Sequence, residues 1–260
     1  MTGKSIDRIR IVLFGVGAAN VATYRLLKAY GFDPKAIIAC DSKGILHAGR
    51  RDIESRQHEF ADKWRICLES NGDGRRGGPE NAFAGADVCI AFSRSGPGVI
   101  LPEWVATMAH DAAVFAAANP VPEIFPEAAA NPGARIVATG RSDFPNQLNN
   151  SLVFPGMFRG VVDVRARTIS DRMAIAAAEE LVAAAREKGL AANRLLPAMG
   201  DWTVAARIAG AVGAAAAAEG LARNPLSRAE LEKSAIATIG ASRACVEELV
   251  GAGLISPLPK

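Results

Sequence analysis

The chain has few cysteines, few aromatic residues and no long hydrophobic run. Its four cysteines lie far apart, without a CxxC pair or a Cys/His spacing typical of zinc sites. This pattern excludes a disulfide-stapled scaffold and favours a reduced, cytoplasmic setting. The alanine-rich tract 204–218 is interrupted by Arg207 and is shorter than the roughly 18 to 20 apolar residues that a membrane span requires. The polar residues 1–10 do not have the pattern of a signal peptide. We therefore expect a soluble protein without a membrane partner.

An excess of charge of one sign is also missing. Thirty basic residues stand against 27 acidic ones, which gives a formal net charge of +3. Lysine and arginine occur in runs no longer than pairs such as Arg50-Arg51, whereas nucleic-acid sites need extended basic patches. We therefore expect no nucleic-acid partner.

Short apolar runs alternate with helical patterns through the first half of the chain. Strands that are buried on both faces read as continuous apolar runs, and the intervening segments are long enough for crossover helices. The sequence therefore predicts an α/β fold with a doubly wound, Rossmann-like parallel sheet. The predicted strands are residues 11–14, 36–40, 88–92, 112–117 and 135–138.

The last third of the chain has helical periodicity. The predicted helices are residues 170–188, 202–222 and 228–249. We expect this part to be mostly helical.

A glycine-containing turn follows the first predicted strand. Gly15 permits a tight turn, Gly17 allows the backbone to approach a pyrophosphate, and the next helix offers free N–H groups to the phosphates. Asn20 stands where the ideal motif has a third glycine or an alanine, so we expect looser packing between helix and strand. The alternative is a purely structural turn between strand and helix.

Asp41 ends the second predicted strand, about twenty residues after the glycine turn. A carboxylate at this place binds the adenosine ribose of NAD and repels the extra phosphate of NADP. We therefore expect NAD, with NADP as the second choice, and Lys43 could offset the repulsion. Alternatively, Asp41 only forms the turn.

Polar side chains also follow the fourth and fifth predicted strands. Asn119 lies after the fourth, and Arg141 and Asp143 lie in a polar loop after the fifth. Ligands of open parallel sheets bind beyond the carboxyl ends of strands. Arg141 could clamp a substrate carboxylate and Asp143 could act as a general base. The pair could equally brace the loop as a salt bridge.

The remaining ionisable groups give little indication of catalysis. We expect His47, His58 and His110 to be surface residues, and Tyr24 and Tyr30 to pack within the first helix. No set of residues with metal-ligand spacing is present in the sequence, so we expect no metal site.

Five motifs together resemble the NAD-binding domain of bacterial malic enzymes. The resemblance runs from about Arg10 to Ala222, so we expect a dinucleotide-binding domain over residues 1–222 and a helical extension over 223–260. The motifs are Gly-Val-Gly-Ala-Ala at 15–19, Ala-Asn-Pro-Val-Pro-Glu at 118–123, Thr-Gly-Arg-Ser-Asp at 139–143, Asn-Asn at 149–150 and Phe-Pro-Gly-Met-Phe-Arg-Gly at 154–160.

The resemblance implies roles for several residues. Asn119 and Asn150 would contact substrate carboxylates. In malic enzymes the catalytic tyrosine and lysine and the metal ligands lie upstream of the glycine turn, whereas only about ten residues precede the first strand here. The chain therefore resembles the cofactor domain without its partner half. The residues expected at the cofactor are Gly15, Gly17, Ala18, Ala19, Asp41, Ser93 and Asn119.

Three functions remain open from the sequence. The first is an NAD(P)-dependent dehydrogenase that acts on a small molecule, with the acid–base group supplied by its own loops or by a second subunit of a homo-oligomer. Malate is disfavoured because its oxidative decarboxylation uses a metal, so a different hydroxy acid, an amino acid or a one-carbon folate derivative is expected. The second is a non-catalytic NAD-binding subunit that senses redox state or completes a site with a separate catalytic chain. The third is a structural protein with a vestigial fold.

Overall fold

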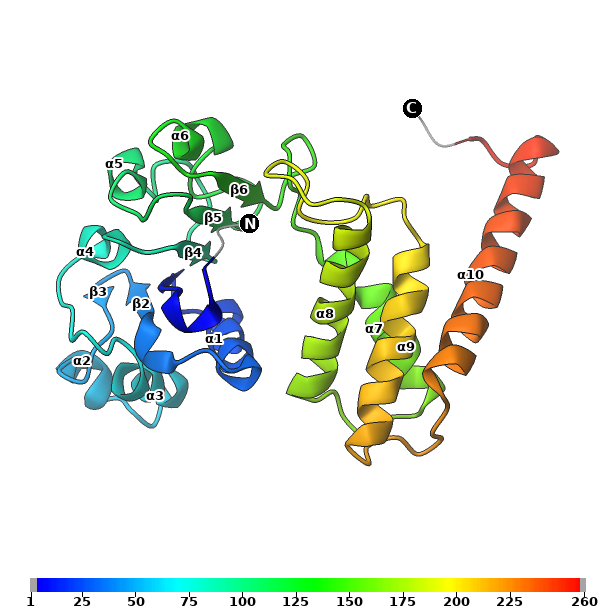
Figure 1. Ribbon diagram of the computed structural model, residues 1–260, viewed down its shortest axis with the longest axis horizontal. Coiled ribbons are helices and arrows are strands. Elements are labelled where there is room, and N and C mark those ends of the chain that lie inside the picture. Colours follow the sequence, from blue (N-terminus) through cyan, green and yellow to red (C-terminus); the bar gives the residue numbers. More distant parts are fainter. Residues whose placement is uncertain (1–3, 258–260) are drawn as a thin grey trace. The chain divides into compact units, whose positions relative to one another are not determined.

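The computed structural model describes residues 4–257, which divide into two compact units (Figure 1). The first unit comprises the chain up to Asn149 and the segment Leu190–Leu195, and the second comprises Asn150–Gly189 and the chain from Leu196 onward. The sequence predicts a domain boundary after residue 222, where the resemblance to malic enzymes ends. This boundary was drawn from the resemblance and not from compactness, and it stays a prediction. The outer ends of the two predicted domains, residues 1–3 and 258–260, lie outside the described residues.

The first unit is built on a six-stranded sheet of order β3-β2-β1-β4-β5-β6. All neighbouring strands are parallel except β3, which pairs antiparallel with β2. The doubly wound α/β fold is confirmed, and the five predicted strands agree with the structure to within one residue at each end. The two-residue strand β3 was not predicted, because so short a segment has no periodicity. The strands are β1 (Ile11–Phe14), β2 (Ile37–Asp41), β3 (Gly44–Ile45), β4 (Val88–Ala91), β5 (Ala113–Ala116) and β6 (Ile136–Thr139).

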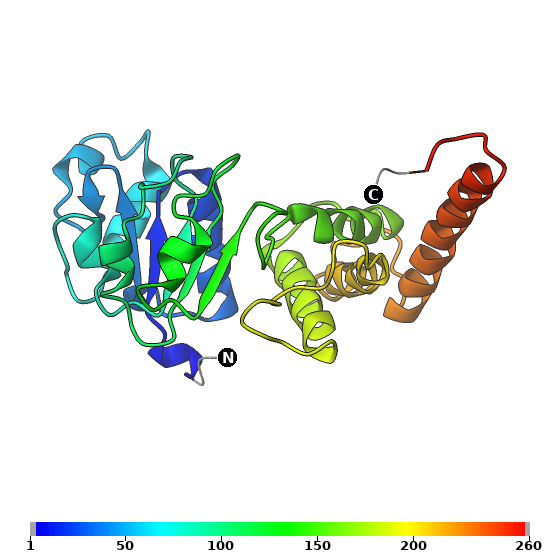
Figure 2. The ribbon, with the colours of Figure 1, turned by 90° about the horizontal axis from the view of Figure 1, so that it is seen from above.

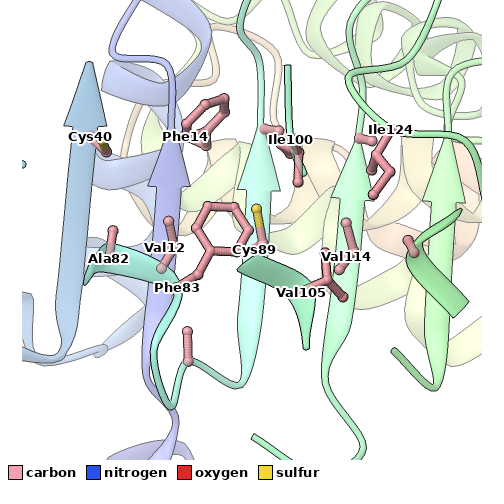
Figure 3. Close-up of a cluster of buried hydrophobic side chains, with 14 of the residues drawn as sticks. Val12, Phe14, Cys40, Ala82, Phe83, Cys89, Ile100, Val105, Val114 and Ile124 are labelled. Carbon is pink, nitrogen blue, oxygen red and sulfur yellow. The ribbon is translucent and has the colours of Figure 1, made fainter. Parts of the chain in front are cut away.

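Helices cover both faces of this sheet, because successive strand residues point to opposite sides. Ile11 and Leu13 of β1 belong to the apolar cluster formed with helices 18–30, 51–54 and 61–69. Val12 and Phe14 belong to a second cluster, formed with helices 79–83, 102–105 and 126–130. Figure 3 shows Phe14 beside Phe83 in the second cluster, with ring centroids 5.9 Å apart. The helices of this unit are η1 (Ile6–Arg8), α1 (Ala18–Tyr30), η2 (Pro34–Ala36), α2 (Arg51–Glu54), α3 (Ala61–Glu69), α4 (Pro79–Phe83), α5 (Pro102–Val105) and α6 (Pro126–Ala130).

The second unit consists of helices (Figure 2). Ser170 and Ser227 accept hydrogen bonds from the third backbone N–H of α8 and α10, which explains where these helices begin. Of the three predicted helices, α8 and α10 end within two residues of their predicted bounds, and α9 ends four residues earlier than predicted. The helices are η3 (Asn150–Leu152), α7 (Phe154–Asp163), α8 (Asp171–Glu187), α9 (Thr203–Ala218) and α10 (Arg228–Gly251).

The alanine-rich helix α9 forms the centre of the second unit. Gly156 and Gly160 of α7 face it so closely that a Cβ on them would lie 2.5 and 2.6 Å from the carbonyl oxygens of Ala205 and Ala209. Small residues on both helices therefore permit the close approach of their backbones. Within residues 4–257, no helix has both the length and the apolar character needed to cross a membrane.

A buried carboxylate joins three helices of this unit. Glu180 of α8 accepts hydrogen bonds from Arg207 of α9 and from Arg228 of α10, each at 2.6 Å. Its side chain is 8% exposed. Removal of either arginine would leave one buried carboxylate oxygen without its charged donor, which is costly. The pairing therefore fixes the position of α10, whose later turns are exposed.

Candidate functional site

The carboxyl ends of five parallel strands lie at one edge of the sheet. Strand order reverses between β1 and β4, because β2 and β3 extend the sheet on one side of β1 and β5 and β6 extend it on the other. Open α/β sheets bind ligands outside the carboxyl ends of the strands at such a reversal. Of the residues predicted from sequence, all except Asn150 lie on segments that follow or end these strands.

The glycine turn lies directly at this reversal. Gly15 has φ +85°, and its N–H donates to the Cys40 carbonyl at 2.8 Å. A Cβ on Gly15 would lie 2.7 Å from the Cβ of Ser93, whereas a Cβ on Gly17 would have no atom within 4 Å. Ala18 and Ala19 are exposed at the start of α1, where helical N–H groups have no intrahelical acceptor. The open space at Gly17 therefore leaves room for a diphosphate over these donors.

Asn20 corrects one expectation from the sequence. Its side chain is fully buried, and its amide nitrogen donates to the carbonyls of Phe14, Gly15 and Ile90 at 3.1, 2.8 and 3.2 Å. The predicted loose packing of helix and strand is therefore wrong: the amide joins α1 to the ends of β1 and β4. Its other polar atom, Oδ1, is buried and has no hydrogen-bond partner within the described part of the chain.

Asp41 lies at the end of β2, as predicted, and is surrounded by cations. Its Oδ1 accepts hydrogen bonds from the Lys43 N–H at 2.9 Å and from Arg50 Nη1 at 3.1 Å. Its Oδ2 accepts from Arg50 Nη2 and from Lys63 Nζ, both at 3.2 Å. Burial alone would raise the pKa of Asp41, but the hydrogen bonds and the charges of Arg50 and Lys63 outweigh it and lower the pKa. Asp41 is therefore ionised and tightly paired.

Arg50 was not recognised from the sequence, because the Arg50-Arg51 pair has the character of a surface segment. Its side chain is 9% exposed and makes a second bidentate pair, with Asp52 at 2.8 and 2.9 Å. Lys43 also pairs with Asp52 at 3.4 Å. The guanidinium therefore holds two carboxylates at the end of β2.

Glu123 is the second group that the sequence did not reveal. Its side chain is completely buried, and Oε1 accepts hydrogen bonds from the Ser93 N–H at 2.8 Å and from the Ser93 hydroxyl at 3.0 Å. Oε2 accepts from the Ala118 N–H at 3.1 Å. The carboxylate thus joins the loop after β4, which carries Ser93, to the loop after β5, which carries Asn119.

Asn119 is exposed beyond β5, and the following peptide bond to Pro120 is cis. A Cβ on Gly140 would lie 2.8 Å from the Asn119 Oδ1, so the amide lies over the first residue after β6. Asn150 belongs to the second unit, where it is exposed and begins η3. Asn119 therefore lies next to Gly140 in the first unit, whereas Asn150 belongs to the second unit.

Arg141 and Asp143 form the salt bridge that the sequence left as one of two alternatives. Arg141 Nε and Nη2 donate to the two Asp143 oxygens, each at 2.7 Å. The Arg141 guanidinium also lies 5.7 Å from the centroid of the Phe144 ring. Hydrogen bonds from Arg141 lower the pKa of Asp143. The geometry favours the loop brace over a general base, because a paired carboxylate of low pKa accepts a proton poorly.

The histidines and tyrosines lie in varied surroundings. His58 and His110 are exposed, whereas His47 is half-buried and its Nδ1 accepts the Gly49 N–H at 3.0 Å. Tyr24 is buried and donates to Glu69 at 3.0 Å, while Tyr30 is 50% exposed. Among residues 4–257, no group of three or more His, Cys, Asp or Glu side chains could hold a metal ion.

Comparison with known proteins shows what this chain is similar to. Residues 100–218 match the family model described as malic enzyme, NAD binding domain. In sequence and in fold the chain is similar to malic enzymes, and the similarity includes their NAD-binding domain. The resemblance inferred from the five motifs is thereby confirmed.

Similar proteins were also found by comparison of whole sequences. The bifunctional malic/malolactic enzyme of Bacillus subtilis (strain 168) is 42% identical over 227 residues, which cover 86% of this chain and 52% of that protein. The NAD-dependent malic enzyme of Geobacillus stearothermophilus is 40% identical over 220 residues, covering 85% and 44%. The chain therefore spans about half the length of these curated relatives.

Solved structures agree with the sequence comparison. The crystal structure of Entamoeba histolytica malic enzyme matches with a TM-score of 0.93 and 40% identity, covering 98% of this chain and 52% of that one. The malic enzyme of Pyrococcus horikoshii Ot3 matches with a TM-score of 0.88 and 42% identity, covering 95% and 57%. Since these relatives are named malic enzymes, the expectation of a substrate other than malate finds no support.

Proposed function

We propose that this chain binds NAD or NADP as the dinucleotide-binding part of an oxidoreductase of the malic enzyme type. The observation that carries the proposal is the open space at Gly17, over the exposed start of α1 and at the reversal of strand order. Free helical N–H groups and the helix dipole favour a diphosphate there. Gly15, Ala18, Ala19, Asp41, Ser93 and Asn119 complete the proposed cofactor site.

The proposed substrate is malate, bound through its carboxylates. The amides of Asn119 and Asn150 offer N–H donors for this purpose. The nicotinamide supplies the hydride chemistry when it is bound, and the protein holds the reacting groups in place. We also propose that the dinucleotide-binding domain extends to residue 222, with residues 223–260 as a helical extension.

The acid–base group of such a reaction is proposed to come from outside this edge of the sheet. Asp41, Glu123 and Asp143 each already accept hydrogen bonds from two or more donors. In all three carboxylates both oxygens already accept a hydrogen bond, so each is a poorer proton acceptor for a substrate hydroxyl than an unpaired carboxylate would be. A second subunit of a homo-oligomer or a separate catalytic chain would supply the group. Because these carboxylates are already hydrogen-bonded, we also propose a second function, that of a non-catalytic NAD-binding subunit.

Binding and turnover separate the two functions. We expect the purified full chain to enhance and shift the fluorescence of NADH on titration. Turnover is measured with malate and manganese, and with a panel of hydroxy acids, amino acids and folates. Turnover that falls in Asn150→Ala with NADH affinity kept, and in Asn119→Ala, supports the oxidoreductase. Binding without turnover on the whole panel supports the non-catalytic subunit, and absence of any dinucleotide binding contradicts both.

A further inference from the structure

The carboxylate of Asp41 has no acceptor capacity left for a ribose. A carboxylate offers about four lone-pair sites, and Asp41 accepts four hydrogen bonds, two on each oxygen. Three of the donors are side-chain N–H groups of cations, and the fourth is the Lys43 backbone N–H. For Asp41 to bind both hydroxyls of an adenosine ribose, charged partners would have to leave it. The ribose-binding role expected from the sequence therefore conflicts with the observed pairing.

The group of charges around Asp41 has an excess of positive charge. Arg50, Lys43 and Lys63 stand against Asp41 and Asp52. An anion that approaches this group is attracted by its single excess positive charge. The repulsion of a phosphate that a lone aspartate would produce is therefore cancelled.

Two of the cations remain able to bind a ligand. The Lys43 side chain is 69% exposed and pairs with Asp52 at 3.4 Å, a loose contact. The Lys63 side chain is 25% exposed and donates to Asp41, while an ammonium group has three N–H donors. Arg50, by contrast, is buried and divided between its two carboxylates. The lysines are therefore the groups that a ligand can reach.

This group of charges adjoins the glycine turn. The Gly15 N–H donates to the carbonyl of Cys40, the residue before Asp41. The ends of β1 and β2 are therefore held side by side, so a dinucleotide with its diphosphate at Gly17 directs its adenosine ribose toward β2.

We propose that Lys43 and Lys63 are specificity-determining residues that receive the 2′-phosphate of NADP, and that Asp41 holds Lys63 in place instead of binding the ribose diol. The proposal rests on the dinucleotide binding proposed above. NAD, which lacks the phosphate, binds without using the two lysines. The site thus takes both cofactors.

Replacement of Asp41 does not test this proposal. If Asp41 binds the ribose diol, Asp41→Ala removes an acceptor for the ribose hydroxyls. If the lysines bind the 2′-phosphate, Asp41→Ala releases Arg50 and Lys63 from their carboxylate partner. Both changes favour NADPH over NADH. Lysine variants separate the two interpretations. If Asp41 binds the ribose diol, loss of Lys63 frees an oxygen and strengthens NADH binding. If the lysines bind the phosphate, their loss weakens NADPH binding and leaves NADH unchanged.

The experiment is calorimetric titration of the full chain with NADH and with NADPH. We expect the wild type to bind the two within about tenfold of each other, and Lys43→Met/Lys63→Met to lose about tenfold or more of its NADPH affinity, the effect of one or two charge-assisted hydrogen bonds. NADH affinity is expected to change less than about twofold. Added salt should weaken NADPH binding more than NADH binding in the wild type, and equally in the variant.

Controls separate this result from damage to the fold and from failure of the proposed function. Lys28→Met removes an exposed lysine that pairs with Glu69 and should change neither affinity. Lys43→Met alone, at an exposed turn, should shift affinity in the same direction if the double variant unfolds. Unchanged NADPH affinity, or a gain in NADH affinity, overturns the assignment of the lysines. A wild type that binds NADH but not NADPH also overturns it, whereas a wild type that binds neither refutes the proposed function itself.

Discussion

The buried carboxylate of Glu123 accepts hydrogen bonds from both the N–H and the hydroxyl of Ser93, at 2.8 and 3.0 Å. The two residues belong to different loops, one after β4 and one after β5. The N–H of Ala118, next to Asn119, donates to the other carboxylate oxygen. One side chain therefore fixes two loops that carry proposed site residues.

Glu123→Gln should destabilise the fold and weaken NADH binding together. The amide keeps one acceptor but places N–H donors against the N–H of Ser93 or Ala118, which leaves a buried donor unpaired at a cost of about 1 to 3 kcal/mol. Urea unfolding and fluorescence titration measure the two effects. The matched control is Glu127→Gln, at an exposed carboxylate on α6, which should change neither. A stable variant with normal affinity would show that Glu123 does not position the loops.

Replacement by alanine should have different effects at Gly15 and at Gly17. Gly15→Ala strains a backbone at φ +85° and places a Cβ 2.7 Å from the Phe92 carbonyl oxygen, so we expect a loss of stability of about 2 kcal/mol or more. Gly17 has φ −94° and open space, so Gly17→Ala should keep its stability to within about 0.5 kcal/mol. The methyl group nevertheless occupies the proposed diphosphate site, and we expect NADH affinity to fall. Thermal unfolding and titration measure both, and normal NADH affinity in Gly17→Ala would contradict the site.

The sheet could be predicted from sequence because its strands are buried on both faces. Runs such as Ile11–Phe14 and Ile37–Asp41 are almost continuously apolar, and nothing else of that length and composition fits their place between helical segments. The strand ends then indicated Asp41 and Asn119 as candidates, since chain order alone brings parallel strand ends to one edge. The strands and the residues at their ends could be predicted because both depend on the local sequence and on the order of the strands along the chain.

The polar partners could not be predicted, because they depend on tertiary contacts. Glu123 lies between prolines and Ile124 in a segment with the composition of a surface turn, and only folding buries it. Arg50 meets Asp41 because the short strand β3 folds the chain back onto β2. Asn20 offered one signal: an amide at the third glycine position can donate to the carbonyls of adjacent strand ends. That signal was interpreted only as a loss of close packing.

The Arg141–Asp143 pair should control the ionisation of Asp143. Two hydrogen bonds of 2.7 Å from the guanidinium stabilise the carboxylate. Arg141→Met should therefore raise the pKa of Asp143 toward the ordinary value for aspartate, as followed by carbon NMR of the carboxyl group during a pH titration. The control is Arg135→Met, which removes an arginine partner of Asp111 and should leave the pKa of Asp143 unchanged. An unchanged pKa of Asp143 in Arg141→Met would mean that the salt bridge between Arg141 and Asp143 does not form in solution.

The buried thiol of Cys40 should make the fold less stable at alkaline pH. Burial, together with the charge of Asp41, raises the pKa of Cys40 from 9.0 to about 12, against the opposing effect of Arg50. The folded protein therefore keeps a proton that the unfolded chain loses between these values, so stability is full below pH 9 and falls as pH rises toward 12. Urea unfolding of wild type and Cys40→Ala between pH 8 and about 10.5 compares the slopes, and the variant should fall less steeply. Cys245→Ala, at an exposed thiol, should keep the wild-type slope. Parallel pH profiles for wild type and Cys40→Ala would show that the Cys40 thiol ionises as easily in the folded protein as in the unfolded chain.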